Sequence, residues 1–186
     1  MSEQQSHEDA RTSGNARVLI VQPERSYLAV IAHRVAAAGF RVALADSVPT
    51  AVGELYRVQP DIVLTELTGK RFSGIELLSI IRGDSALRDT PVLMFAGRSD
   101  RNAGIQALRA GADAIVKKPF HFETLCARID RELQRRRAFE ELRRDKNSLD
   151  ARITERAIVV GELKDRLAAS EAERFRLEAI VTTAGL

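Results

Sequence analysis

The side chains of this chain that could do chemistry are two carboxylates and a lysine, each placed at the end of an apolar run. Glu24 follows the first such run, Glu66 ends the third, and Lys118 follows the last. Carboxylates are the ligands that a hard cation such as Mg²⁺ prefers, and a lysine can neutralise an anion. The sequence therefore offers the parts of a cation or anion site, provided that the fold brings these three run ends together.

Several further basic residues lie near the same run ends and leave two interpretations open. They could bind an anionic ligand such as a nucleotide, or they could be solvated surface charge, which we favour. His33 and His121 have no cysteine or histidine at metal-ligand spacing, and there is no nucleophile motif or glycine-rich phosphate loop. We therefore expect no metal site, no cofactor and no enzymatic activity. The additional basic residues are Lys70, Arg71, Arg98 and Lys117.

The apolar runs alternate with segments of helical periodicity. Five runs have the length and composition of buried parallel strands, and each precedes a segment with apolar residues at helical spacing. Repeated strand–helix units predict a parallel sheet with helices on both faces, a doubly wound α/β fold whose functional groups lie beyond the carboxyl ends of the strands. The expected strands are 17–21, 41–45, 61–66, 91–97 and 114–116, and the expected helices run up to Gly39, over 48–58, 74–82 and 100–110, and from Phe120 onward.

Five sequence motifs resemble those of one protein family. They are QPE at 22–24, PDIVLTEL at 60–67, Gly74, PVLMFAG at 91–97 and GADAIVKKPF at 111–120. In these motifs and their spacing, residues 17–137 resemble the receiver (CheY-like) domains of response regulators. The resemblance implies a five-stranded parallel sheet with the strand order 2-1-3-4-5.

The resemblance also implies a shared set of working groups. In active receivers, two acidic residues after the first strand and an aspartate ending the third hold Mg²⁺. The aspartate accepts a phosphoryl group and a lysine neutralises it, because transfer between anionic oxygens needs its negative charge offset. A serine or threonine ending the fourth strand binds the phosphoryl oxygens, and an aromatic residue on the fifth strand follows that movement.

This sequence keeps the lysine, Lys118, and departs from the family at the other positions. A glutamine and a proline cannot replace two carboxylates, and an alanine cannot donate a hydrogen bond. We therefore predict that the phosphorylation chemistry is lost. The degenerate positions are Gln22 and Pro23 in place of the acidic pair, with Glu24 as the remaining acid, Glu66 for the phosphoacceptor, Ala96 for the hydroxyl and Ile115 for the aromatic residue.

Glu66 has three possible roles. Its carboxylate could imitate a phosphorylated aspartate, although it supplies a charge of −1 against about −1.5 to −2 for a phosphate. It could also form a plain ion pair with Lys118 that fills the old pocket, which is the interpretation we favour. In the third, Glu24 and Glu66 form an unconventional metal site and Glu66 is phosphorylated.

The pattern changes after Phe120, and strand-like runs do not return. Residues 122–183 contain no proline and a single glycine, Gly161. Apolar residues recur there at alternating spacings of three and four, which predicts a coiled coil, whereas a helix folded back on the globular domain is the alternative. The basic residues Lys146, Arg156 and Arg174 interrupt this seam. Its apolar members are Phe139, Leu142, Leu149, Ile153, Val160, Leu163, Leu167, Leu177 and Val181.

Composition sets the remaining expectations. We predict a disordered leader over 1–16, a degenerate receiver domain over 17–137 and a coiled-coil helix over 138–186. The lone Cys126 excludes an intramolecular disulfide, and no apolar run could cross a membrane, so we expect a cytoplasmic protein. The basic run at 135–137 alternates with acidic residues, and nucleic-acid binding is not expected.

These observations favour a phosphorylation-independent signalling adaptor. We expect a parallel homodimer through the coiled coil, and a protein partner in a bacterial two-component pathway. The family resemblance implies docking on the face of the fourth helix, fifth strand and fifth helix. The alternative is the N-terminal regulatory receiver and signalling helix of a larger sensor kinase or cyclic-nucleotide enzyme.

Overall fold

The computed structural model describes residues 15–69, 72–97 and 101–183, with side chains up to 176 other than those of residues 101 and 175. The chain divides into two compact units, residues 1–138 and residues 139–186.

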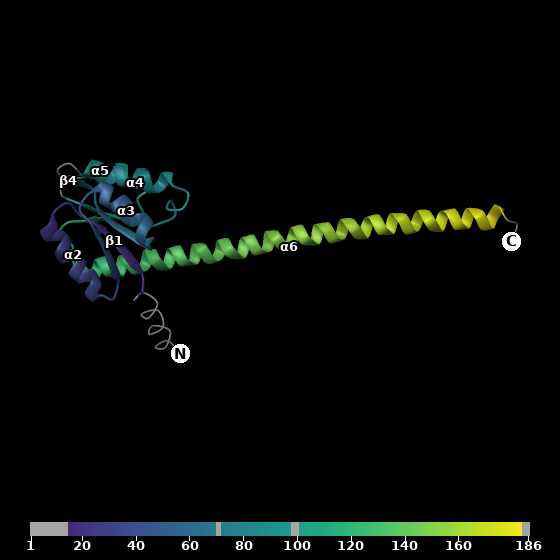
Figure 1. The fold of residues 1–186 in the computed structure, drawn as a ribbon, viewed down its shortest axis with the longest axis horizontal. Helices are drawn as coiled ribbons and strands as arrows, with labels where there is room; N and C mark the ends of the chain where they lie inside the picture. Colours follow the sequence, from purple (N-terminus) through teal and green to yellow (C-terminus); the bar gives the residue numbers. More distant parts are fainter. Residues whose placement is uncertain (1–14, 70–71, 98–100, 184–186) are drawn as a thin grey trace. The chain divides into compact units, whose positions relative to one another are not determined.

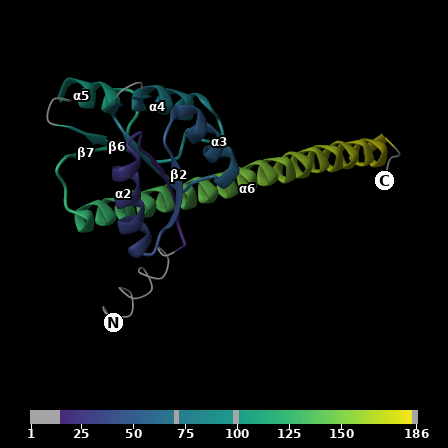
Figure 2. The ribbon, with the colours of Figure 1, turned by 60° about the vertical axis from the view of Figure 1, so that its left-hand side comes forward.

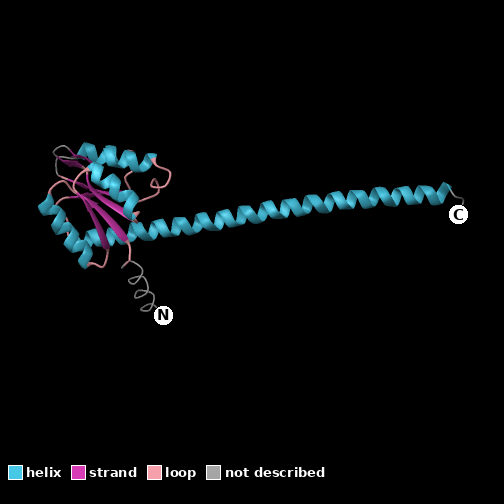
Figure 3. Cartoon of the chain, in the orientation of Figure 1, coloured by secondary structure: helices cyan, strands magenta, loops and turns pink. Residues whose placement is uncertain are grey.

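A parallel sheet forms the centre of the first unit (Figure 3). Its five strands have the order β2-β1-β3-β6-β7, which confirms the predicted doubly wound fold and its strand order. All five residues of both β3 and β6 are buried, as expected for central strands covered on two faces. The strands are β1 (Arg17–Val21), β2 (Arg41–Ala45), β3 (Ile62–Glu66), β6 (Val92–Ala96) and β7 (Ala114–Lys117).

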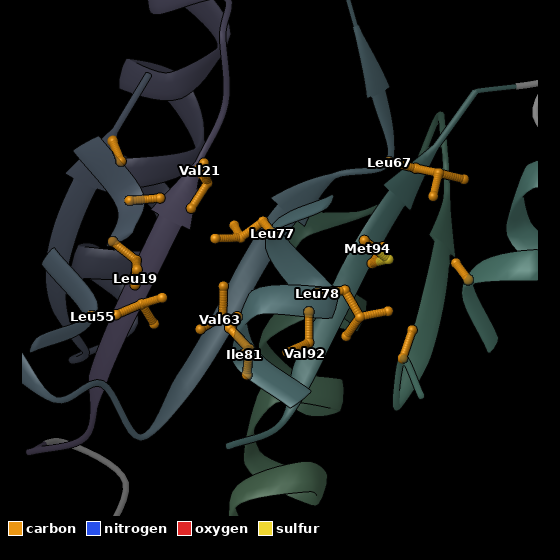
Figure 4. Close-up of a cluster of buried hydrophobic side chains, with 14 of the residues drawn as sticks. Leu19, Val21, Leu55, Val63, Leu67, Leu77, Leu78, Ile81, Val92 and Met94 are labelled. Atoms are coloured by element: carbon orange, nitrogen blue, oxygen red, sulfur yellow. The ribbon is translucent and has the colours of Figure 1, made fainter. Parts of the chain in front are cut away.

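Helices cover both faces of this sheet (Figures 1 and 2). On one face, Leu55, Leu77 and Ala107 from three successive helices pack against Leu19 and Met94 of the strands in one core, part of which Figure 4 shows. The other face is covered by α2 and the first turns of α6. The helices are α2 (Arg25–Ala37), α3 (Val48–Val58), α4 (Gly74–Gly83), α5 (Arg101–Arg109) and α6 (Phe122–Thr183).

Local signals explain where several helices begin and end. The Ser47 hydroxyl accepts a hydrogen bond from Thr50 N at the start of α3, and the Ser73 hydroxyl does the same for Glu76 N at the start of α4. Gly39, two residues after the end of α2, has a φ of 96°, the conformation in which glycine is favoured. These caps fix the lengths of the helices between the strands.

The structure differs from the sequence expectations at three places. The last helix begins at Phe122 rather than Phe120, and residues 118–121 form an irregular connection between β7 and this helix. A small antiparallel hairpin, β4 (Thr68–Gly69) and β5 (Phe72–Ser73), was not predicted. Ala16, which we expected in the disordered leader, is buried, and its carbonyl accepts a hydrogen bond from Arg41 N. Residues 1–14 lie outside the described part of the chain.

The second unit consists of the continuation of α6. Over the described residues 139–176, the apolar seam side chains are all exposed, with exposed fractions from 49% at Val160 to 67% at Leu142. The side chains of Leu177 and Val181 lie outside the described residues. No helix in the described part of the chain is long and apolar enough to cross a membrane.

Candidate functional site

The predicted site residues meet at the carboxyl edge of the sheet. Gln22 follows β1, Glu66 is the last residue of β3, and Lys118 follows β7. Because all the strands are parallel, their carboxyl ends lie at one edge, and the three side chains reach one another there. The structure thus brings Gln22, Glu66 and Lys118 together at this edge, whereas the carboxylate of Glu24, which we also expected there, is exposed and bonds to Ser26 instead.

The Glu66 carboxylate is the centre of the pocket. Lys118 Nζ lies 2.5 Å from Glu66 Oε2, and Gln22 Nε2 donates a hydrogen bond of 2.6 Å to the same oxygen. The Glu66 side chain is 8% exposed and that of Lys118 is 27% exposed. The ion pair that we favoured for Glu66 is present, and the neutral amide of Gln22, which follows the neighbouring strand β1, donates to the same oxygen.

Gln22 is held in one orientation by its two ends. Its amide nitrogen donates to Glu66, and its amide oxygen accepts a hydrogen bond from Glu24 N at 3.2 Å. The exposed Glu24 side chain accepts a hydrogen bond from Ser26 Oγ at 2.9 Å. Glu24 therefore orients Gln22 through its backbone, while its carboxylate bonds to a neighbour on its own loop.

Tyr27, a residue of α2, also belongs to this pocket. Lys118 Nζ lies 4.4 Å from the centroid of the Tyr27 ring, a cation–π contact. Burial, followed by the carboxylates of Glu66 and Glu24, raises the pKa of the Tyr27 phenol above 10.0. Its helical spacing indicated only a packing residue, and no sequence signal distinguished the two roles.

The donor set does not fit the Mg²⁺ ion that active receivers hold. The nitrogen of Gln22 and the ammonium of Lys118 both point at Glu66 Oε2, where a cation would bind. Pro23 offers no ligating side chain and packs so close to Gly69 that a β-carbon there would lie 3.1 Å from Pro23 Cγ. Within the described residues, no group of three or more His, Cys, Asp or Glu side chains could hold a metal.

Apolar residues, Ala96 and Ile115, occupy the positions of the family's hydroxyl and aromatic residues. Ala96 is 3% exposed and ends β6, and its carbonyl accepts a hydrogen bond of 2.8 Å from Lys118 N. Ile115 on β7 is half-buried and packs against the core on the α3–α4–α5 face. Neither side chain can form a hydrogen bond, so the charge of Glu66 has no polar side chain at these positions through which to act on α5.

A surface cavity of about 450 Å³ lies between β7 and the start of α6. Its apolar lining includes Ile115 and Phe120, and its titratable lining residues are Lys117, His121 and Arg128, with no carboxylate among the lining residues. Arg128 is anchored there by a 3.1 Å hydrogen bond to the Ile115 carbonyl. Of the other basic residues near the run ends, Lys70, Arg71 and Arg98 lie outside the described residues.

The fold and this pocket define a receiver-type signalling domain with an altered pocket. Residues 18–130 match the family of response regulator receiver domains. The chain therefore belongs to the response regulator receiver family, and the family prediction from the sequence motifs is confirmed.

Relatives agree with this assignment. The chain is 29% identical over 119 residues to the phosphate regulon transcriptional regulatory protein PhoB of Escherichia coli, covering 64% of this chain and 52% of that protein. It is 31% identical over 125 residues to the transcriptional regulatory protein KdpE of Mycobacterium tuberculosis, covering 67% and 54%. The crystal structure of the receiver domain of NtrX from Brucella abortus superimposes with a TM-score of 0.58 at 25% identity, covering 63% of this chain and 98% of that one. The chain spans about half the length of the two regulators.

Proposed function

We propose that this receiver domain holds one conformation and works as a phosphorylation-independent signalling adaptor that docks a protein partner. The observation that carries the proposal is the Glu66 carboxylate, buried at the phosphoacceptor position with Lys118 and Gln22 on one oxygen. In this arrangement the ammonium group of Lys118 is already paired with the carboxylate of Glu66.

The chemistry of phosphoryl transfer supports the same proposal. Transfer to a carboxylate needs a cation that offsets the charge of the phosphoryl oxygens, and the residues around Glu66 do not fit Mg²⁺. Ala96 cannot bind a phosphoryl oxygen, and Ile115 cannot follow one by hydrogen bonding. Because this pocket neither accepts a phosphoryl group nor passes a change in charge to α5, we assign the function to the surface of the domain.

The docking surface that we propose includes the cavity between β7 and α6. It combines apolar walls with the basic side chains of Lys117 and Arg128, so we expect a partner segment that carries an apolar anchor and acidic flanks. The neighbouring helix α5 adds two exposed apolar side chains, Ile105 and Leu108. Together these elements correspond to the face on which the family resemblance implies docking.

We also propose that two copies associate through residues 139–183. Large apolar side chains that recur at spacings of three and four and lie exposed favour a partner helix. Two linked receiver domains would increase the effective concentration of weak docking contacts.

The test is intact-protein mass spectrometry after incubation with acetyl phosphate and Mg²⁺. We expect the wild-type chain to stay unmodified. A variant with Gln22→Asp, Pro23→Asp, Glu66→Asp and Ala96→Thr serves as the positive control, because it restores the family's acidic pair, acceptor and hydroxyl. An adduct of about 80 Da on the wild type that disappears in Glu66→Ala would instead establish an unconventional phosphorylated receiver.

A second candidate is the regulatory front part of a larger protein, such as a sensor kinase or cyclic-nucleotide enzyme. The coverage of 52% of PhoB and 54% of KdpE favours it, since receivers in these relatives make up part of a longer chain. Sequencing the open reading frame beyond codon 186 separates the candidates, because a continuing frame with an output domain would replace the adaptor by a regulatory segment.

A further inference from the structure

The seam of residues 139–176 consists of two alternating sets of positions. In heptad terms, the first set contains Lys146 and Arg174 and the second contains Arg156, with apolar residues or Ser170 at the other seam positions. All of these seam side chains are exposed in the described helix. The placement of the basic residues in the two sets decides in which direction a second copy can pack. This inference rests on the proposed dimer.

A parallel pair of helices would set each seam residue against its own copy. Lys146 would then face Lys146, Arg156 would face Arg156, and Arg174 would face Arg174 at the centre of the interface. Three layers would bring like charges together where water is partly excluded, and each such layer is unfavourable.

An antiparallel pair removes all of these contacts, because each residue of one set then faces a residue of the other set. In one register, Val160 faces Leu163 of the second copy. Arg156 and Arg174, the basic seam residues whose facing residues the structure describes, then both face an apolar side chain. The layers between 149 and 174 are then Val160 with Leu163, Ile153 with Ser170, Arg156 with Leu167, and Arg174 with Leu149. The long aliphatic stems of arginine can pack on these leucines while the guanidinium groups reach water.

Neighbouring registers are less favourable. A shift of seven residues in one direction would bring Arg156 against Arg174 of the second copy. A shift of seven residues in the other direction would set residues 178–183 against residues 133–138 of the second copy, a part of α6 in which Leu133 is buried in the receiver core. The Val160–Leu163 register therefore combines the longest overlap with the absence of facing cations.

The charges that flank the seam do not distinguish the two arrangements. In a parallel pair, Asp145 would repel Asp150 and Arg166 would attract Glu171 of the second copy. In the antiparallel pair, Asp150 would repel Glu171, while Arg152 would attract Glu173. Each arrangement has one kind of attractive and one kind of repulsive flanking pair within the described residues, so the seam layers decide.

We infer that two copies of this chain pack their 139–183 helices antiparallel, centred on the Val160–Leu163 layer. This arrangement replaces the parallel one that we expected from the heptad pattern alone. The partner that the helix selects is a second copy of this chain, running in the opposite direction.

Cysteine cross-linking of the full chain tests the inference. In a Cys126→Ser background, Ser170→Cys alone would cross-link in a parallel pair. In the antiparallel register, the two copies of residue 170 lie about 26 Å apart at 1.5 Å per residue, too far for a disulfide. We therefore expect no cross-link from Ser170→Cys alone. The double variant Ile153→Cys/Ser170→Cys should link residue 153 of one copy to residue 170 of the other, identified by mass spectrometry of the joined peptides.

Light scattering on the wild-type chain distinguishes a failure of the proposed self-association from a failure of its antiparallel direction. A monomeric mass would overturn the proposed self-association itself. A dimeric mass together with efficient cross-linking of Ser170→Cys alone would overturn only the antiparallel direction. A dimer in which the double variant fails to form the 153–170 link would overturn the register.

Discussion

Replacing Lys118 by methionine tests how far the receiver domain depends on the pocket charge. Methionine keeps much of the apolar length of the side chain but removes the ammonium group, which lies 2.5 Å from Glu66 Oε2. The Glu66 side chain is 8% exposed, so its carboxylate would remain buried with the neutral Gln22 amide as its donor. A buried charge that loses its counter-ion is one of the few single changes that destabilise a domain strongly.

The size of the effect follows from burial. Two unit charges about 4 Å apart attract by about 4 kcal/mol at an effective dielectric constant of about 20, and breaking a fully buried pair by removing one partner costs about 3–5 kcal/mol. The Lys118 side chain is 27% exposed, and water recovers part of this energy. We therefore expect the free energy of unfolding to fall by about 1–3 kcal/mol.

Urea unfolding followed by tyrosine fluorescence measures this change in the full chain. The sequence has two tyrosines and no tryptophan, and Tyr27 and Tyr56 both lie in the receiver domain, so the signal reports this domain alone. The matched control is Lys117→Met, an exposed lysine on β7, for which we expect a change within about 0.5 kcal/mol.

A double-mutant cycle isolates the pair from other effects of the substitution. In the double variant Glu66→Gln/Lys118→Met, the buried charge is removed with its partner, and most of the lost stability should return. The reasoning is refuted if Lys118→Met costs no more than Lys117→Met, or if the double variant is as unstable as the two single variants would predict additively.

Three further perturbations test other contacts in the domain. A β-carbon at Gly74 would collide with the Glu66 carbonyl, so Gly74→Ala should lower the free energy of unfolding by about 1–3 kcal/mol, whereas Gly53→Ala, with open space around it, should raise it by about 0.5–1 kcal/mol; equal effects in urea unfolding would contradict this. Arg82 donates to three backbone carbonyls and to a carboxylate, so Arg82→Met should cost about 2–3 kcal/mol in the same assay, and a loss under about 0.5 kcal/mol would show that the cluster does not stabilise the fold. Burial and nearby carboxylates raise the pKa of the Tyr27 phenol above 10.0. The contribution of Tyr27 to stability is therefore complete below pH 10 and is lost as the pH rises through the pKa of the folded state. Glu66→Gln should lower this pKa in an ultraviolet titration, and an unchanged pKa would exclude Glu66 as a cause.

Much of the site could be predicted because it depends on strand ends. A buried parallel strand is visible as an apolar run, and the residue after it must lie at the carboxyl edge of the sheet. The ends of these runs therefore predict that Gln22, Glu66 and Lys118 lie at one edge of the sheet. The ion pair could be predicted because Glu66 and Lys118 carry opposite charges and both lie at this edge.

The parts that could not be predicted depend on side-chain direction and on very short elements. Tyr27 has the spacing of a core residue of α2, and only three-dimensional packing reveals that its ring lies over Lys118. The β4–β5 hairpin has strands of two residues, which are too short to show an alternating pattern.

The contacts at the two ends of β7 affect how this edge strand opens. β7 has four residues and one neighbour in the sheet, a position from which strands usually fray. At its start, Asp113 N donates to the Val92 carbonyl and the Asp113 carboxylate binds Arg82; at its end, Lys118 N donates to the Ala96 carbonyl and Lys118 Nζ binds Glu66. With both ends held, the strand should open as one unit, so its amide hydrogens are expected to exchange at closely similar rates instead of progressively faster toward one end.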